Sequence, residues 1–266
     1  MNHLILAALV LLNQSYGPKI KPSPDNMPPG SIGRKIPSFV IPMPTGKTAS
    51  LTDFNESKCL VFVFLGANCP VSNAYIPTLN ELGQKYKKSE VQFLGIYANP
   101  GDTRESIEKH VREFKINFPV LEDLEQISLR LLGARRTSEV LVLDQRRTVQ
   151  YQGRIDDQIT NTVRKEKAAT NDLSDAIDQI LNLKKPMVAY TESPGCLITP
   201  ITKVNESKIT YASHIAGILH KHCADCHHPG TAAPFSLLSY DDAKNNAAMI
   251  KEVTGLHIMP PWHADP

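Results

Sequence analysis

The sequence predicts an α/β domain with a central sheet over residues 37–185, followed by a smaller all-helical segment over residues 207–266. Three patterns support this prediction: apolar runs of strand type alternate with helical periodicities, a hairpin and a last helix close the first domain, and no strand pattern follows Ser207. Residues 18–36, rich in Pro, Gly and Lys, and residues 186–206 are expected to be linkers.

Apolar runs locate the strands in order along the first domain. A short hairpin is expected around Gly46, between FVIP and KTASL. KCLVFVFLG (58–66) is a continuous run of apolar, β-branched and aromatic residues, which is typical of a fully buried strand, and VQFLGIYA (91–98) is a second one. Further strands are expected at FPVLED, EVLVLD and TVQYQG, the last two joined by a turn at QRR.

Helical spacing of apolar residues locates the helices between these strands. One helix is expected over residues 72–87, and another opens at Asp102 with Glu105 three residues later, as in a capping box. The last helix of the domain begins near Asn171. The apolar faces of the second and last helices are Ile107, Val111, Phe114 and Leu173, Ala176, Ile177, Ile180, Leu181. The helical segment shows two faces, Tyr211, Ile215, Ile218, Leu219 and Ala243, Ala247, Ile250, Val253, the second with Ser239 and Asp242 at its start.

Composition excludes some classes of protein. The chain of 266 residues is 41% hydrophobic and 21% charged, which is typical of a soluble globular protein and not of a disordered one. The net charge is +2, with 29 basic and 27 acidic residues and no basic block. Nucleic acid is therefore not an expected partner, and no nucleotide cofactor is expected.

The N-terminus has the layout of a secretory signal. Its apolar run at residues 4–12 is too short to span a bilayer but fits the core of a signal, with Ser15 and Gly17 as small residues before a cut. We expect residues 1–17 to be a signal peptide, no integral membrane span after its removal, and a periplasmic or otherwise exported protein. The alternatives are an uncleaved anchor or a buried N-terminal helix. In an oxidising compartment, cysteine pairs can be structural or redox-active.

LGANCPVSNAYIP (65–77) places a single cysteine where a buried strand turns into a helix. Cys69 at a helix N-terminus is close to the positive end of the helix dipole and to free backbone N–H groups, which favour the nucleophilic thiolate. Ser72 stands where a dithiol enzyme has its second cysteine, and its hydroxyl could donate a hydrogen bond to the thiolate. The alternative is that Cys69 is an inert buried thiol, as we expect for Cys59 at the head of its strand.

The strand, the turn, the helix and Pro77, eight residues after Cys69, resemble the thioredoxin-like redoxins of the AhpC/TSA type. The resemblance implies a thioredoxin-like fold and redox activity at Cys69. Ser138 stands where this fold carries a cis-proline, and we expect it to be trans because a cis non-proline bond costs about 3–4 kcal/mol. The peroxidatic pattern P-x-x-x-T-x-x-C is absent, since Phe62 stands at its Pro position and Gly66 at its Thr position. Thiol–disulfide chemistry is therefore favoured over peroxidase chemistry.

The linker after the first domain contains one candidate for a thiol that could resolve a disulfide formed at Cys69. Cys196 lies in ESPGCLITP, a loop flanked by Pro and Gly. It is either the resolving thiol or an unpaired loop cysteine, because disulfide pairing cannot be deduced from sequence.

HKHCADCHH (220–228) contains the Cys-x-x-Cys-His attachment motif of c-type haem. Cys223 and Cys226 would bond the two vinyl groups, and His227 would be the proximal iron ligand. Met259 is the expected sixth ligand, with His257 and His263 as rivals. Residues 207–266 resemble the small cytochrome c-like module fused to redoxin domains in some exported bacterial proteins, in an incomplete form without the closing helix.

Other chemistry remains open at these sites. Cys223 and Cys226 could form a disulfide, zinc could bind a cluster that also contains His220, His222, His227 and His228, and copper could bind His257, Met259 and His263. The expected function is an exported thiol–disulfide oxidoreductase linked to one-electron transfer through one haem, with a thiol, disulfide or redox protein as partner. The alternatives are a catalytically silent docking module and a one-cysteine peroxidase.

One polar stretch has no assigned role. GRIDDQIT (153–160) places Arg154, Asp156 and Asp157 directly after a predicted strand. We expect it to be a solvated turn.

Overall fold

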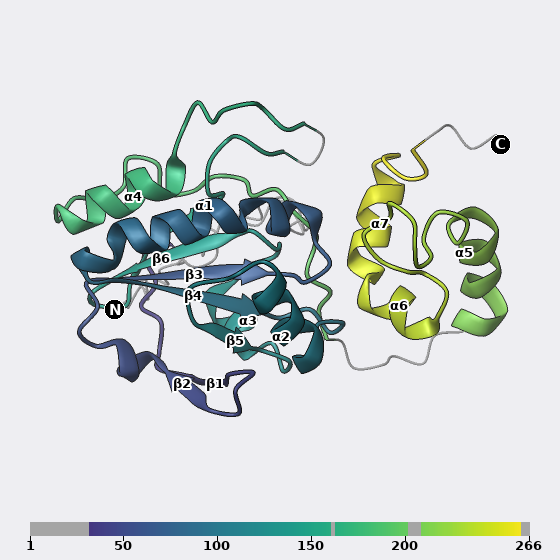
Figure 1. Ribbon diagram of the computed structural model, residues 1–266, viewed down its shortest axis with the longest axis horizontal. Helices are drawn as coiled ribbons and strands as arrows, with labels where there is room; N and C mark the ends of the chain where they lie inside the picture. Colours follow the sequence, from purple (N-terminus) through teal and green to yellow (C-terminus); the bar gives the residue numbers. More distant parts are fainter. Residues whose placement is uncertain (1–31, 161–162, 202–208, 262–266) are drawn as a thin grey trace, which may run out of the picture.

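A mixed five-stranded sheet forms the centre of the first domain in the computed structural model, which describes residues 32–160, 163–201 and 209–261. The strand order is β5-β4-β3-β6-β7. β4 and β5 run parallel to β3, whereas β6 is antiparallel to β3 and β7 is antiparallel to β6 (Figure 1). The strands are β3 (Cys59–Leu65), β4 (Val91–Tyr97), β5 (Val120–Glu122), β6 (Val140–Asp144) and β7 (Val149–Gly153). The predicted α/β fold with a central sheet is confirmed.

β3 is the middle strand and is buried along its whole length. Its alternate residues point to two separate hydrophobic cores, one on each face of the sheet. One core packs against α1 (Pro70–Tyr86) and α4 (Asp172–Leu181), and the other packs against α3 (Ile127–Leu132) and the hairpin of β1 (Val40–Pro42) and β2 (Thr48–Ser50). Burial on both faces explains why the sequence of β3 is continuously apolar instead of alternating.

The start of α2 (Arg104–Glu113) differs from the prediction. Thr103 is the N-cap residue, and its Oγ1 accepts a hydrogen bond from the backbone N–H of Ser106. Asp102, predicted to open this helix, instead turns its carboxylate inward to the backbone N–H of Ala67. Two 3₁₀ turns, Leu51–Phe54 and Lys87–Ser89, complete the elements of this domain.

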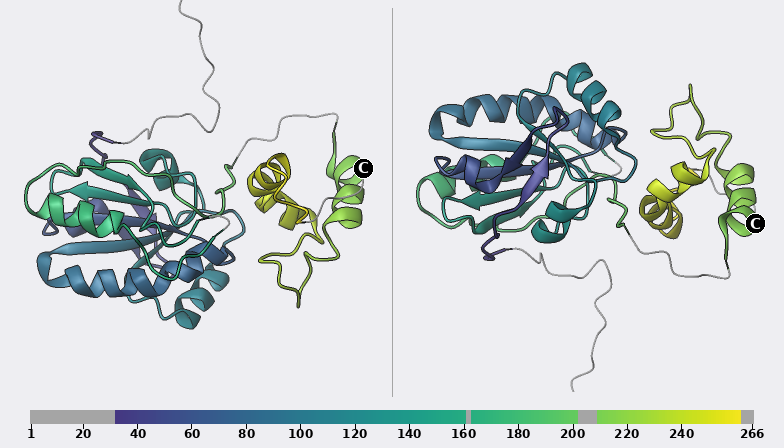
Figure 2. Two further views of the ribbon diagram at one scale, coloured as in Figure 1. Left: turned by 90° about the horizontal axis from the view of Figure 1, so that it is seen from above. Right: turned by 90° about the horizontal axis from the view of Figure 1, so that it is seen from below.

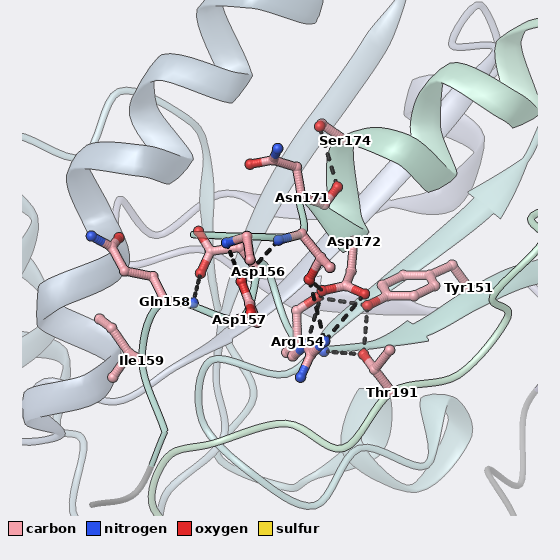
Figure 3. A network of polar contacts seen from close by, with 12 residues as sticks. Tyr151, Arg154, Asp156, Asp157, Gln158, Ile159, Asn171, Asp172, Ser174 and Thr191 are labelled. Atoms are coloured by element: carbon pink, nitrogen blue, oxygen red, sulfur yellow. Dashed lines mark hydrogen bonds and ion pairs between the residues drawn. The ribbon is translucent and has the colours of Figure 1, made fainter. Parts of the chain in front are cut away.

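The stretch of residues 153–160, predicted to be a solvated turn, is largely buried, so that prediction was wrong. Asp156 is only 5% exposed and accepts hydrogen bonds from the Tyr75 hydroxyl at 2.7 Å and from the backbone N–H of Gln158. Asp157 accepts from backbone N–H groups of the chain that precedes α4, and Arg154 forms an ion pair with Asp172 at the start of α4 (Figure 3). The network therefore ties the end of β7 to both α1 and α4.

The described part of the C-terminal segment is helical. It contains a π-helical turn, Tyr211–Ile215, followed by α5 (Ala216–His222), α6 (Tyr240–Asn245) and α7 (Ala247–Gly255). Ser239 and Asp242 form the capping box of α6, and the predicted single helix is divided at Asn246. Figure 2 shows this segment beside one end of the first domain.

The core of the helical segment is small. Its core cluster of buried residues is Leu219, Leu237 and Ala243, whereas Ile218, predicted on a packed face, is 58% exposed. Across the described residues of the chain, none of the helices combines the length and the apolar character that a membrane crossing requires. The expected signal peptide lies outside the described residues, as does His263.

Candidate active site

Cys69 is the N-cap residue of α1, at the carboxyl end of the buried strand β3. Its Sγ accepts a hydrogen bond from the backbone N–H of Ser72 at 3.4 Å, and the residue is 3% exposed. The strand fixes the position of the turn, and Pro70 at the first helical position starts the helix without losing a hydrogen bond. The sulfur therefore lies at the positive end of a helix of 17 residues.

Ser72 contacts Cys69 in a different way from the one predicted. The backbone N–H of Ser72 reaches the sulfur, while the Ser72 hydroxyl oxygen accepts a hydrogen bond from the backbone N–H of Gly66 at 3.3 Å. The side chain therefore holds the loop between β3 and α1, and it is fully buried there.

Cys196 lies against Cys69, although its loop follows α4. Both cysteines are free thiols, and the Cys196 thiol is close enough to stabilise the thiolate of Cys69. Thr137 joins the two: its Oγ1 donates to Cys69 Sγ at 3.0 Å and accepts from the backbone N–H of Cys196 at 3.0 Å. The backbone N–H of Thr137 also donates to the Cys196 carbonyl at 2.9 Å.

These hydrogen bonds lower the pKa of Cys69 to about 6. The largest contribution comes from the Cys196 thiol, and those of Thr137 and the Ser72 N–H add to it, while burial opposes them. The pKa of Cys196 is raised for the reciprocal reason, since its proton is held by the Cys69 sulfur. Arg136 acts in the opposite direction on Cys196 through its positive charge.

Gly195 allows the Cys196 loop to approach this closely. Its φ is +109°, and a Cβ atom at this position would lie 2.2 Å from the carbonyl oxygen of Thr137. A residue with a side chain would therefore force the loop away from β6. The Arg136 guanidinium donates to the Gly195 carbonyl at 2.9 Å and holds the loop from its outer side.

Ser138 directly follows Thr137, the residue whose side chain contacts the Cys69 sulfur. The bond before it is trans, as expected, and its φ of +67° places it in the left-handed region. Its backbone N–H donates to the Phe64 carbonyl at 2.6 Å, so the residue continues the pairing of β3 with β6. The left-handed conformation costs roughly 1–2 kcal/mol for a residue with a Cβ atom, and the structure shows that serine replaces the proline without a cis bond.

Asp102 belongs to this site, although the sequence analysis assigned it to a helix cap. Its Oδ1 accepts from the backbone N–H of Ala67 at 3.1 Å, and the residue is 3% exposed. Its Oδ2 is buried without a hydrogen-bond partner. Burial raises the pKa of Asp102 to about 7, and the negative charge of Cys69 adds to the rise. The available signal was its position, since Asp102 follows the carboxyl end of a buried strand beside β3.

A cavity of about 290 Å³ opens beside the two thiols. Cys69, Cys196 and Asp102 form one wall, and residues of the helical segment, among them Phe235 and Asp242, form the other. Arg136 and Glu252 of α7 form an ion pair across the two parts, in which Arg136 Nη1 lies 3.0 Å from Glu252 Oε2. The helical segment therefore covers the thiol site.

The Cys-x-x-Cys-His motif lies at the end of α5. Its Cys223 is half-buried and Cys226 is exposed, and both are free thiols rather than a disulfide. The Nδ1 of His227 donates to the Phe235 carbonyl at 3.0 Å, which leaves Nε2 available as a ligand. Met259 is 36% exposed, so its thioether is accessible. The free thiols of Cys223 and Cys226 and the His227 Nε2 atom are donor groups of the kind that haem c uses.

The zinc alternative lacks support from the geometry. Among residues 32–160, 163–201 and 209–261, no three His, Cys, Asp or Glu side chains are grouped so that they could hold a metal ion. The six His and Cys residues of the HKHCADCHH stretch are therefore not gathered into a zinc site. The copper alternative includes His263, which lies outside the described residues.

Comparison with known proteins shows what the first domain is similar to. Residues 32–155 match the AhpC/TSA family. The chain is 27% identical over 136 residues to the thiol-disulfide oxidoreductase ResA of Geobacillus thermodenitrificans, covering 51% of this chain and 73% of that protein. It is 32% identical over 92 residues to ResA of Bacillus thuringiensis subsp. konkukian, covering 35% of this chain and 51% of that protein. The chain thus spans only about half the length of the second relative.

Two solved structures share the fold of the first domain. A hypothetical protein from Sinorhizobium meliloti 1021 superposes with a TM-score of 0.59 at 26% identity, over 65% of this chain and 96% of that one. An uncharacterized conserved protein from Geobacillus kaustophilus gives a TM-score of 0.58 at 24% identity, over 65% and 94%. The first part of the chain therefore has a thioredoxin-like α/β fold, and a helical segment follows it.

Proposed function

We propose that this protein is a thiol–disulfide oxidoreductase in which Cys69 attacks the substrate and Cys196 resolves the product. The observation that carries the proposal is the position of Cys196 beside Cys69, where Thr137 Oγ1 bonds to both residues and the pKa of Cys69 is lowered to about 6. With this pKa, most Cys69 is thiolate at neutral pH, and thiolate is the attacking species. The names of the ResA relatives support the same activity.

The reaction proceeds in two exchanges. The Cys69 thiolate attacks one sulfur of a substrate disulfide, forms a mixed disulfide and releases the other sulfur as a thiolate. The Cys196 sulfur then attacks Cys69, the Cys69–Cys196 disulfide forms, and the second substrate sulfur leaves as a thiolate. The proton of Cys196 passes to one of the released thiolates. The protein loses two electrons in total and the substrate disulfide gains them.

The second exchange becomes easier once the first has occurred. In the reduced protein, the charge and hydrogen bond of Cys69 raise the pKa of Cys196. In the mixed disulfide Cys69 carries no charge, so this cause disappears and the positive charge of Arg136 remains. Ser72 stands at the position where a dithiol enzyme has its second cysteine. In this arrangement a thiol from a separate loop, Cys196, takes the place of that cysteine.

Peptide mapping of the protein oxidised by a small disulfide tests the proposal. We expect a Cys69–Cys196 peptide pair in the wild type, a trapped mixed disulfide at Cys69 in Cys196→Ser, and no adduct at this site in Cys69→Ser. Cys226→Ser is the control, because this exposed thiol is far from the site in sequence and does not line the cavity. A wild-type protein without the Cys69–Cys196 pair contradicts the proposal.

Two other functions predict different results. A silent docking module predicts a Cys69 pKa close to that of free cysteine, about 8.5. A one-cysteine peroxidase predicts peroxide consumption, with a thiol reductant, that persists unchanged in Cys196→Ser.

We also propose that the helical segment carries one covalently bound haem c and that the protein is exported. The hydrogen bond from His227 Nδ1 to the Phe235 carbonyl supports this, because such a bond fixes the ring and leaves Nε2 for a metal. Cys223 and Cys226 would hold the porphyrin, with Met259, His257 or His263 opposite His227. When bound, haem supplies one-electron transfer.

Expression with haem c maturation tests this second proposal. We expect a haem-stained band in a denaturing gel that is lost in the Cys223→Ser, Cys226→Ser double variant and retained in Cys69→Ser. A colourless wild-type protein overturns it. Export predicts that the N-terminus of the mature protein begins near Pro18, which N-terminal sequencing measures.

A further inference from the structure

We propose that the cavity beside Cys69 and Cys196 binds a small disulfide that carries a primary ammonium group. This inference rests on the proposed thiol–disulfide activity and names the class of substrate. It is derived from the size of the cavity, the charges of its lining and one unpartnered oxygen atom.

The cavity is too small for a folded protein substrate. Its volume of about 290 Å³ is at the lower end of the range for small-molecule sites. Cys69 is 3% exposed, and the helical segment forms the opposite wall through Phe235 and the side chains that start α7. Gly101 of the redoxin domain approaches Asn245 so closely that an added Cβ atom would lie 3.3 Å from that side chain. A protein disulfide would require the two parts to separate, whereas a small disulfide does not.

The charged side chains that line the cavity are both acidic. Within the described part of the chain, these are Asp102 from the redoxin domain and Asp242 from α6. The other polar lining consists of one hydroxyl and four carboxamides, Ser236, Asn68, Asn99, Asn245 and Asn246. Such a lining attracts a cation and repels an anion, particularly next to the Cys69 thiolate.

Positive charge near the thiols is already paired. Arg136 faces Cys196, but its guanidinium forms the ion pair with Glu252, and the Glu252 carboxylate acts on Cys196 in the opposite direction. Arg136 also does not line the cavity. The site therefore offers an anionic substrate little compensation for the two carboxylates.

Asp102 Oδ2 points to the class of group that binds. It is buried and has no hydrogen-bond partner, whereas Oδ1 is satisfied by the Ala67 N–H. Leaving a buried carboxylate oxygen unpaired is costly, and a charged donor provides the strongest hydrogen bond to it. A primary ammonium group supplies three N–H donors, which suit Asp102, Asp242 and the carboxamide oxygens together.

Three bonds separate each ammonium nitrogen from the nearer sulfur in a disulfide such as cystamine, and Asp102 and Cys69 line the same cavity, so one molecule can contact both. In the first exchange the Cys69 thiolate bonds to one sulfur of this disulfide and a thiolate leaves. In the second, Cys196 bonds to Cys69 and the other aminothiol leaves, with the Cys196 proton on one of the two products. The disulfide is the oxidant, and it gains the two electrons that the protein loses.

The test compares three small disulfides of similar size but different charge with the full-length reduced protein. The probes are cystamine, which is cationic, 2-hydroxyethyl disulfide, which is neutral, and 3,3′-dithiodipropionate, which is anionic. Rates of oxidation of the Cys69–Cys196 pair are measured by mass spectrometry at about pH 8, where Asp102 is ionised, and each is divided by the rate with free 2-mercaptoethanol. We expect the normalised rate for cystamine to exceed that for the anionic disulfide at least about tenfold.

Matched variants assign the preference to the cavity. Asp242→Asn keeps an acceptor for the capping bond from the Ser239 N–H but removes the charge, and it should reduce the cystamine preference several-fold. Asp241→Asn, in the same first turn of α6 but outside the cavity, should leave the preference unchanged. Asp102→Asn removes the other lining charge, on the side of the first domain, and should also reduce the cystamine preference.

The outcomes separate the inference from the proposed function. Equal normalised rates for the three disulfides, or a cystamine preference unaffected by both Asp242→Asn and Asp102→Asn, overturn the inference and leave the thiol–disulfide activity intact. Failure of all three disulfides to form the Cys69–Cys196 bond overturns the proposed function and the inference together.

Discussion

Cys196 lies beside Cys69 and stabilises its thiolate, although one residue caps the first helix of the first domain and the other lies in the loop after its last helix. The neighbouring thiols act on each other in opposite directions. Their contact lowers the pKa of Cys69 and raises that of Cys196, so the two thiols differ in acidity in the reduced protein.

Removal of the Cys196 thiol should weaken the Cys69 thiolate. In Cys196→Ala we expect the pKa of Cys69 to rise from about 6 to about 7–8, because the hydrogen bond that contributes most is lost. Cys196→Ser should remain closer to the wild type, since its hydroxyl can still donate. Thiolate absorbance in the ultraviolet, titrated against pH, measures the change. An unchanged pKa in the alanine variant contradicts this account.

Thr137 should influence both thiols. Thr137→Val removes the donor to Cys69 Sγ and the acceptor for the Cys196 N–H. We expect a smaller rise in the Cys69 pKa than in Cys196→Ala, together with slower formation of the Cys69–Cys196 disulfide. Thr137→Ser retains the hydroxyl and is the control. Rapid quench with a thiol reagent measures the rate of disulfide formation, and equal rates in the valine and serine variants would refute the role.

The charge of Asp102 should make stability depend on pH. Its folded-state pKa of about 7 lies above the ordinary value of 3.8, so the folded protein holds a proton that the unfolded chain releases. The wild type should therefore lose stability relative to Asp102→Asn as pH rises from about 4 to about 7, by at most about 4 kcal/mol, with little further change above that range. Urea unfolding of both proteins across the range measures this, and a difference that grows in favour of the wild type has the wrong sign.

Tyr75 should stabilise the fold without affecting the thiols. Tyr75→Phe leaves Asp156 Oδ1 without its hydroxyl donor and the Ile159 N–H without its acceptor, both in a buried setting. We expect a loss of about 1–3 kcal/mol in the free energy of unfolding and an unchanged Cys69 pKa. Tyr86→Phe, whose partner Asp178 is half exposed, should cost less. Equal losses in the two variants would show that the buried hydrogen bonds around Asp156 contribute no more to the free energy of unfolding than the half-exposed bond to Asp178.

The ion pair between Arg136 and Glu252 should limit access to Cys69. Glu252→Gln weakens the link between α7 and the Gly195 loop, so the reaction of Cys69 with a bulky maleimide should accelerate several-fold relative to its reaction with iodoacetamide. Glu113→Gln is the control, because Glu113 pairs only with Lys109 on the exposed face of α2. An unchanged ratio of the two rates would show that the helical segment does not restrict the site.

Local patterns were sufficient to predict the sheet, most of the helices and the position of Cys69. The buried strands β3 and β4 follow from their continuous apolar runs, and the N-cap position of Cys69 follows from the strand that precedes it and the proline after it. These features depend on residues that are neighbours in the sequence.

The errors concern polar residues whose partners are distant in the sequence. Asp102 was assigned to a helix cap and Asp156 to a solvated turn, yet their partners are the Ala67 N–H and the Tyr75 hydroxyl. Aspartate is a common residue in helix caps and turns, so the local sequence around these two residues gave no sign that they are buried. Cys196 was left between two interpretations because only the folded chain brings it beside Cys69.

Gly195 determines how closely Cys196 can approach Cys69, although it contains neither sulfur. Because any side chain there would collide with the Thr137 carbonyl, one substitution can displace Cys196 while leaving the helix that activates Cys69 unchanged. In a variant with a side chain at residue 195, Cys69 would keep its place at the start of α1 while the backbone bonds that hold Cys196 to Thr137 would be lost.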